Sequence, residues 1–275
     1  DEPRSRGGLI RVREFTMKDS YSLDMDEEGL DVAYHLHWRA YERIFTQAGL
    51  DFIVVGADVG MMGGSESHEF MAFSPNGEDT ILICPNGDYA ANREVATFKR
   101  IDREPEDQLP TEEVATPDAT TIDKLPDFLG VPASQTAKIV VHKGASGRII
   151  LSVIRGDLDV NETKLRQATG EGDLTPATEA EVREIGVEPG YGSPIGASGA
   201  FVVVDESVRD AANLVSGANK PGYHLKNVNF GRDYEADVVA DIAIAADGYL
   251  CPECGTPMRA TSAIEVGNIF KLGTR

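Results

Sequence analysis

An acidic, proline-containing stretch near residues 102–120 constrains the fold of this chain more than any other feature. Its most acidic parts are DREPED at 102–107 and PTEE at 110–113. Such a segment contributes little apolar surface to a core, and its prolines interrupt regular backbone, so the pattern indicates a linker. At 275 residues, the chain is long enough for two cores, and we expect one on each side of this stretch.

Composition narrows the class of protein. Hydrophobic residues make up 41% and charged residues 26%, which are values of globular rather than disordered chains. No apolar run approaches the roughly 20 residues that cross a bilayer, and the first residues do not resemble a secretion signal, so we expect a cytoplasmic protein without a membrane segment. Three cysteines exclude a disulfide framework and fit a reducing compartment.

The net charge of −20 argues against a protein that coats nucleic acid through its overall field. Any contact with RNA must therefore be local. A salt-adapted host is an alternative explanation of the acidity, and charge alone does not decide between the two.

Hydrophobic patterns before the linker predict a helix over 30–48 and a strand over 52–55. Residues 70–73 and 80–84 read as a second strand pair around the turn Ser74-Pro75-Asn76-Gly77. We therefore expect an α+β segment with antiparallel hairpins.

After the linker, the patterns predict a mixed α/β domain. A helix carries Ile122, Leu125 and Leu129, although Pro126 weakens it. A hairpin pairs 139–141 with 149–154, and helices follow near 161–168 and 179–185, the second with a capping box of Thr178 and Glu181. A strand at 201–204, a helix through 214, a strand at 225–230 and an apolar run at 238–245 complete the domain.

Two short segments before the linker could bind a small ligand. Arg11 and Arg13 would share a strand face and could meet one phosphate, although a solvated edge strand explains the same spacing. A glycine pair at 63–64 precedes Ser65, Ser67 and His68, and it permits close backbone approach, although a solvent-facing turn is an alternative.

The first of these segments resembles motif 2 of class II aminoacyl-tRNA synthetases, and specifically that of the bacterial prolyl-tRNA synthetases. The second resembles their proline-pocket loop, and residues 89–96 follow it as in that family. The resemblance implies ATP with Mg²⁺, proline and tRNA(Pro) as ligands, and a homodimer. It implies ATP or adenylate contacts by Glu2, Arg11, Arg13 and Phe15, and a proline pocket of Gly64, Ser65, Ser67 and His68.

The segment after the linker, about 116–234, resembles the editing domain inserted in the same synthetases, which removes alanine from mischarged tRNA. The resemblance implies a lysine needed for hydrolysis at Lys138, with Asp205 and His224 as further site residues. It also implies a small pocket lined by Thr116, Ile122 and Leu125, and by a glycine-proline loop containing Gly190 and Pro194.

Alternatives remain for these editing residues. On their own, Lys138 could be a surface strand residue and His224 a structural histidine. No serine or cysteine lies in a nucleophile motif, so we expect water to attack the ester.

Cys251 and Cys254 have zinc-knuckle spacing, but Cys84 is the only other cysteine and Gly87 stands where a fourth would complete the pattern. We therefore expect a degenerate site without metal.

We expect 1–101 and 240–275 to form part of the synthetase's antiparallel sheet, and 102–239 to hold the linker and a mixed α/β editing domain. Motif 3 and the arginine that precedes the Asp-Glu pair in the family are absent from the sequence, so we expect no aminoacylation by this chain. A free-standing deacylase and a non-catalytic RNA- or zinc-binding module are the alternatives, and neither accounts for the segments before the linker.

Overall fold

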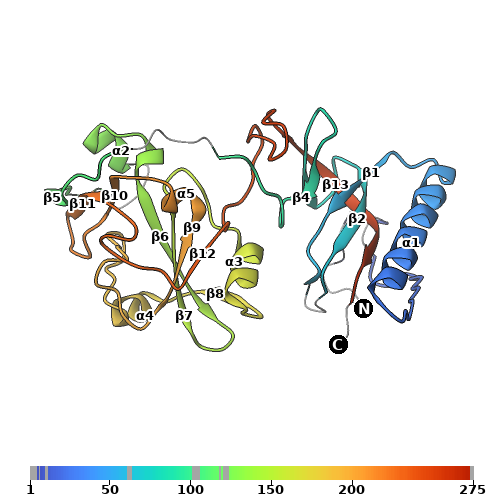
Figure 1. Cartoon of the computed structure of the whole chain (residues 1–275), viewed down its shortest axis with the longest axis horizontal. Coiled ribbons are helices and arrows are strands. Elements are labelled where there is room, and N and C mark those ends of the chain that lie inside the picture. The colour runs from blue at the N-terminus through green and yellow to red at the C-terminus, as the bar shows by residue number, and fades with distance from the viewer. Residues whose placement is uncertain are drawn as a thin grey trace. The chain divides into compact units, whose positions relative to one another are not determined.

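The computed structural model describes residues 5, 7–9, 12–60, 64–100, 106–117, 119 and 124–272. The chain forms two compact units, each with its own sheets (Figure 1). Unit 1 comprises 1–96, 246–248 and 256–275, and unit 2 comprises 97–245 and 249–255. Within the described ranges, no helix is both long and apolar enough to cross a membrane.

Unit 1 is a closed barrel of five strands in the order β1-β2-β13-β3-β4. Neighbouring strands are antiparallel except for β1 and β4, which are parallel and pair only at Gly56 and Ala91. The strands are β1 (Phe52–Gly56), β2 (Ser67–Phe73), β3 (Asp79–Ile83), β4 (Ala90–Asn92) and β13 (Arg259–Phe270).

One long helix, α1 (Glu27–Gln47), packs against the barrel (Figure 1). The Asp26 carboxylate caps it by accepting a hydrogen bond from the Gly29 N–H at 2.9 Å. Tyr34 and Phe45 on its inner face join Phe70 of β2 in an aromatic core cluster. The predicted helix over 30–48 is therefore confirmed.

The predicted hairpin of 70–73 with 80–84 is wrong. Both strands exist, but β13 lies between them and pairs with each. The chain passes so close to β13 that a Cβ atom at Gly77 would lie 2.1 Å from the Ala263 carbonyl oxygen. A local pattern cannot reveal a partner that follows almost 200 residues later.

Unit 2 contains a five-stranded mixed sheet in the order β12-β9-β7-β6-β8 and a three-stranded antiparallel sheet in the order β10-β11-β5. The large sheet comprises β6 (Ala137–Gly144), β7 (Ile149–Arg155), β8 (Leu174–Pro176), β9 (Phe201–Asp205) and β12 (Val238–Ala240). The small sheet comprises β5 (Glu112–Ala115), β10 (Leu214–Gly217) and β11 (Tyr223–Val228). The helices are α2 (Lys124–Leu129), α3 (Glu162–Thr169), α4 (Glu179–Glu184), α5 (Glu206–Arg209) and the 3₁₀ turn η2 (Ala133–Gln135).

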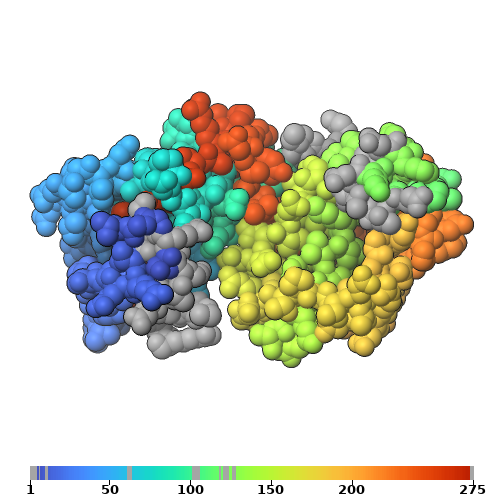
Figure 2. Space-filling model, turned by 180° about the vertical axis from the view of Figure 1, so that it is seen from behind, coloured from blue at the N-terminus to red at the C-terminus, as the bar shows by residue number. Residues whose placement is uncertain are grey.

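The large sheet separates two cores, because successive side chains of a strand point to opposite faces. Leu151 and Val153 of β7 pack with Val204 in one cluster, to which α4 contributes Val182. Ile150 belongs to a second cluster with Leu165 of α3. In the space-filling view, the yellow-green tip of the β6–β7 hairpin lies at the surface beside yellow segments of the same unit (Figure 2).

Local patterns predicted much of unit 2. The β6–β7 hairpin and the Thr178–Glu181 capping box of α4 are confirmed. The predicted linker is too long, because β5 lies inside it and pairs with β11. The helix predicted through 214 is also wrong: α5 ends at Arg209, and Leu214 begins strand β10.

Candidate functional site

A cavity of about 530 Å³ opens in unit 2 beside strand β6. Its walls combine apolar side chains of the sheet and of α4 with a glycine-rich loop, and two glutamates and a histidine add polar groups. The lining residues include Leu125, Ala137, Ile139, Val141, Ala177, Glu179, Val182, Val187, Glu188, Gly190, Gly192, Gly217 and His224. An apolar cavity with a few polar groups is typical of a site for a small ligand.

Glycines shape one wall of this cavity. Gly190 has a φ of 82°, a left-handed conformation that side chains rarely adopt. At Gly217, a Cβ atom would lie 2.1 Å from the Tyr191 carbonyl oxygen, so only glycine permits this approach of β10 to the loop. The predicted loop residue Pro194 is buried and is not among the residues that line the cavity.

The sequence interpretation missed Asn219, which holds the loop in place. Its amide oxygen accepts a hydrogen bond from the Ser193 N–H at 2.8 Å, and its amide nitrogen donates to the Ser193 and Ile195 carbonyls at 3.0 and 2.9 Å. Asn219 has a φ of 50°, and asparagine tolerates this conformation better than most residues. Asn219 lies 24 positions after Ile195 in the sequence, so no local signal could have found it, and only the fold brings it to the loop.

Thr116 and His224, which the resemblance assigned separately to the editing site, lie side by side, and of the two only His224 lines the cavity. Thr116 Oγ1 lies 2.6 Å from His224 Nδ1, and both side chains are buried. β5 and β11 are neighbours in the small sheet, which places these residues side by side. Burial lowers the pKa of His224 below its usual range, so its imidazole is neutral at pH 7 and can accept or donate one proton.

Lys138 borders the cavity from β6, but its ammonium is not free. Nζ lies 2.7 Å from Asp159 Oδ1, and the lysine side chain is 23% exposed. Asp159 was not singled out from the sequence, because nothing local links it to a strand 21 residues earlier. A substrate that contacts the Lys138 ammonium must therefore share it with, or take it from, this carboxylate.

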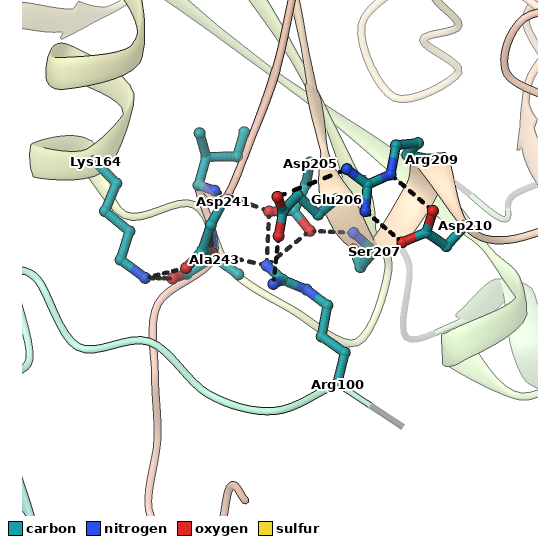
Figure 3. Close-up of polar contacts among 10 residues, drawn as sticks. Arg100, Lys164, Asp205, Glu206, Ser207, Arg209, Asp210, Asp241 and Ala243 are labelled. Atoms are coloured by element: carbon teal, nitrogen blue, oxygen red, sulfur yellow. Dashed lines mark hydrogen bonds and ion pairs between the residues drawn. The ribbon is translucent and has the colours of Figure 1, made fainter. Parts of the chain in front are cut away.

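Asp205 does not line the cavity. It is fully buried at the end of β9, where it caps α5 by accepting a hydrogen bond from the Ser207 N–H at 2.8 Å and also accepts one from the Ile242 N–H at 2.9 Å. Figure 3 shows Arg100 reaching this carboxylate at 3.2 Å and Asp241 at 2.7 Å. The structure therefore places Asp205 in an ion-pair network and not among the residues that line the cavity.

Lys164 completes the network from α3. Its ammonium donates hydrogen bonds to Asp241 and to the Ala243 carbonyl, both at 2.9 Å (Figure 3). Burial lowers the pKa of Lys164, and the nearby Asp241 carboxylate opposes that shift. The network thus connects Arg100, near the start of unit 2, to the end of β9 and to the segment that follows β12.

Of the other residues expected around the editing pocket, Leu125 is 2% exposed and lines the cavity. Ile122 lies outside the described residues.

In unit 1, His68 of the predicted proline pocket lies on β2. Its Nδ1 is 2.7 Å from the Tyr34 hydroxyl, and its ring centroid is 4.7 Å from that of Trp38. Burial lowers the pKa of His68. Gly64 and Ser65 are exposed, Ser67 is buried, and the Ser65 N–H donates to the Lys271 carbonyl.

The predicted adenylate residues give a different picture. Arg13 and Phe15 are exposed and lie in a segment without strand structure, so the expected strand is wrong. Glu2 and Arg11 lie outside the described residues.

Cys84, Cys251 and Cys254 are the residues of the expected degenerate zinc site. Cys84 and Cys251 are buried, and Cys254 is exposed. Structural zinc normally takes four protein ligands, and the expectation that no zinc binds stays a prediction.

Comparisons with known proteins agree on the relatives of this chain. The family model for the aminoacyl-tRNA editing domain matches residues 116–234. Proline-tRNA ligases from Dehalococcoides mccartyi and Salinispora tropica are each 49% identical over 100% of this chain and 48% of their own length. That of Thermoanaerobacter pseudethanolicus is 46% identical over 100% of this chain and 49% of its own. The chain thus spans about half the length of these curated relatives: it is similar to the proline-tRNA ligases over its whole length, and its residues 116–234 match the aminoacyl-tRNA editing domain.

Proposed function

We propose that unit 2 hydrolyses alanyl-tRNA(Pro) and that the cavity beside β6 receives the alanyl group. The observation that carries this proposal is the cavity itself, which combines an apolar wall with His224, the hydrogen-bond partner of Thr116, inside the segment matched by the editing family. Apolar walls suit a methyl side chain, and the polar groups among the lining residues suit an ester.

In the proposed reaction, water attacks the ester carbonyl, and the bond between the acyl carbon and the ribose oxygen breaks. The proton lost by water ends on that ribose oxygen, and the products are alanine and tRNA. The neutral His224, held by Thr116, is able to take part in this proton transfer. Lys138 supplies a positive charge at the edge of the cavity, which suits a phosphate or ribose of the tRNA end.

We also infer that the whole protein ligates proline to tRNA(Pro) with ATP and Mg²⁺, as a cytoplasmic homodimer. The similarity to proline-tRNA ligases over the entire chain supports this inference. Residues 1–101 and 240–275 would then belong to the ligase's catalytic domain and 102–239 to the linker and editing insertion, with His68 in the proline pocket.

Lys138→Ala tests the editing proposal, and Lys143→Ala is its matched control. Both lysines lie on β6 and pair with a carboxylate at 2.7 Å, but only Lys138 borders the cavity. Loss of about 2–4 kcal/mol of transition-state binding should slow hydrolysis of alanyl-tRNA by roughly 30- to 1,000-fold in Lys138→Ala. Lys143→Ala should hydrolyse it at nearly the wild-type rate, and equal rates in the two variants would contradict the role of Lys138.

A further inference from the structure

Helix α2 has two contrasting faces at the edge of the cavity. Leu125 is 2% exposed and lines the cavity, while Leu129 packs with Val215 in a small core cluster. Lys124 and Phe128 are exposed and, four residues apart, are neighbours on the helix surface. The inner face is thus explained by packing, whereas the outer face is not.

Phe128 is 52% exposed, next to the turn that carries Leu125 into the cavity wall. Among the described residues of unit 2, Phe128 is the only large aromatic residue that is exposed. The other exposed large hydrophobic residues there are the aliphatic Leu109 and Val239. A flat aromatic ring in water at the edge of a pocket offers a surface on which a nucleobase can stack.

The charge on this face is also available to a ligand. Elsewhere in unit 2, Lys138, Lys143, Lys164 and Lys220 each pair with a carboxylate. The exposed Lys124 ammonium makes no ion pair or hydrogen bond within the described part of the chain. In a protein with a net charge of −20, an available cation beside an exposed ring favours an anionic, base-bearing ligand.

We propose that Lys124 and Phe128 bind the 3′-terminal nucleotide of the tRNA, with its base stacked on the Phe128 ring and a phosphate beside the Lys124 ammonium. This inference rests on the proposed hydrolysis of alanyl-tRNA. The alanyl group is attached to the ribose of that nucleotide, so when it enters the cavity, the base and phosphate must lie at its edge. The outer face of α2 is there, one helical turn from Leu125.

This surface gives the unit a means of selecting a tRNA end over a free amino acid ester. Stacking accepts any base, so the expected preference is for the presence of a terminal base rather than for its identity. The contribution is to substrate binding, so it should appear in KM and leave kcat nearly unchanged.

The test uses the full 275-residue chain, alanyl-tRNA(Pro) as substrate, and a tRNA with terminal 2-aminopurine and an amide-linked alanine as a probe that cannot be hydrolysed. Phe128→Ala should raise KM by about 5- to 150-fold, which is the range for loss of one stacked base. It should also abolish the quenching of 2-aminopurine fluorescence that we expect with wild type. Phe128→Trp should retain both properties, as should Leu109→Ala, whose residue is 51% exposed and outside the cavity wall.

Lys124→Ala should weaken binding of the same probe and reduce the slope of log Kd against log salt by about 0.7, the value for one phosphate contact on a single strand. Wild-type KM and quenching in Phe128→Ala, or an unchanged salt slope in Lys124→Ala, would overturn the proposal. A wild-type chain that hydrolyses nothing, yet quenches the probe through Phe128, would instead contradict the proposed reaction and support the binding surface.

Discussion

Replacing Asp205 by alanine separates a structural role from a catalytic one. The resemblance implied a site residue, but the structure buries this carboxylate in the network of Figure 3. The change leaves the N–H groups of Ser207 and Ile242 without their acceptor and removes one partner of Arg100. We therefore expect a loss of stability in unit 2 without a direct effect on hydrolysis.

The size of the effect follows from these contacts. Loss of the α5 cap costs about 1 kcal/mol, and an unpaired N–H at the fully buried Ile242 costs about 1–3 kcal/mol. Arg100 keeps Asp241 at 2.7 Å, so the loss of the ion pair is partly compensated. Together we expect a destabilisation of about 3–5 kcal/mol, the range for breaking a buried ion pair.

Urea unfolding, monitored by hydrogen exchange of the backbone amides in β9 and β12, would measure this loss of stability within unit 2. Asp205→Asn, which keeps one carbonyl oxygen as an acceptor, should lose less stability than Asp205→Ala. Both variants should hydrolyse alanyl-tRNA at nearly the wild-type rate per folded molecule. Normal exchange protection together with lost hydrolysis in Asp205→Ala would refute this reasoning and restore Asp205 to the catalytic site.

Three further predictions concern pH and close packing. Burial lowers the pKa of His224 below the usual value of about 6.5. Its neutral form therefore persists above about pH 6.5 and is lost only as the pH falls further. The kcat/KM of alanyl-tRNA hydrolysis should be level from about pH 8 to 6.5 and then fall, and a fall that begins above pH 7 would contradict this. Gly217→Ala should destabilise unit 2 by roughly 2–4 kcal/mol in urea unfolding, because its Cβ would overlap the Tyr191 carbonyl. The control Gly172→Ala has no atom within 4 Å of its Cβ and should cost little, and equal costs would argue against the close approach. Burial raises the pKa of Glu69 to about 7, so the folded state favours the neutral acid and loses stability as the pH rises from about 4.5 through 7. Glu69→Gln should therefore raise the thermal midpoint of unit 1 at pH 8 but not at pH 4, and the same shift at both pH values would count against a raised pKa.

Features that depend on neighbouring residues could be predicted from the sequence. The turn at 144–147 brings β6 and β7 together, and Thr178 caps α4 through Glu181. Both involve residues only a few positions apart, where turn and capping preferences act directly.

Features that depend on distant partners could not be predicted. β13 enters the sheet between β2 and β3, and β5 becomes a strand because β11 lies beside it. The Arg100–Asp205 ion pair joins residues 105 positions apart. In the candidate site, the resemblance named Thr116 and His224 separately, and only the fold shows that they lie 2.6 Å apart. Residue types alone did not reveal the partner of Lys138.

The most direct test of the account compares hydrolysis of alanyl- and prolyl-tRNA(Pro) by the wild-type chain and by a variant with a filled cavity. Ala177 lines the cavity, and Ala180 is an exposed alanine of α4 outside its wall, so Ala180→Trp is the matched control for Ala177→Trp. We expect wild type and Ala180→Trp to hydrolyse alanyl-tRNA and spare prolyl-tRNA, while Ala177→Trp hydrolyses neither. Alanyl-tRNA left intact by wild type, or hydrolysed by Ala177→Trp at the wild-type rate, would contradict the assignment of this cavity as the editing site.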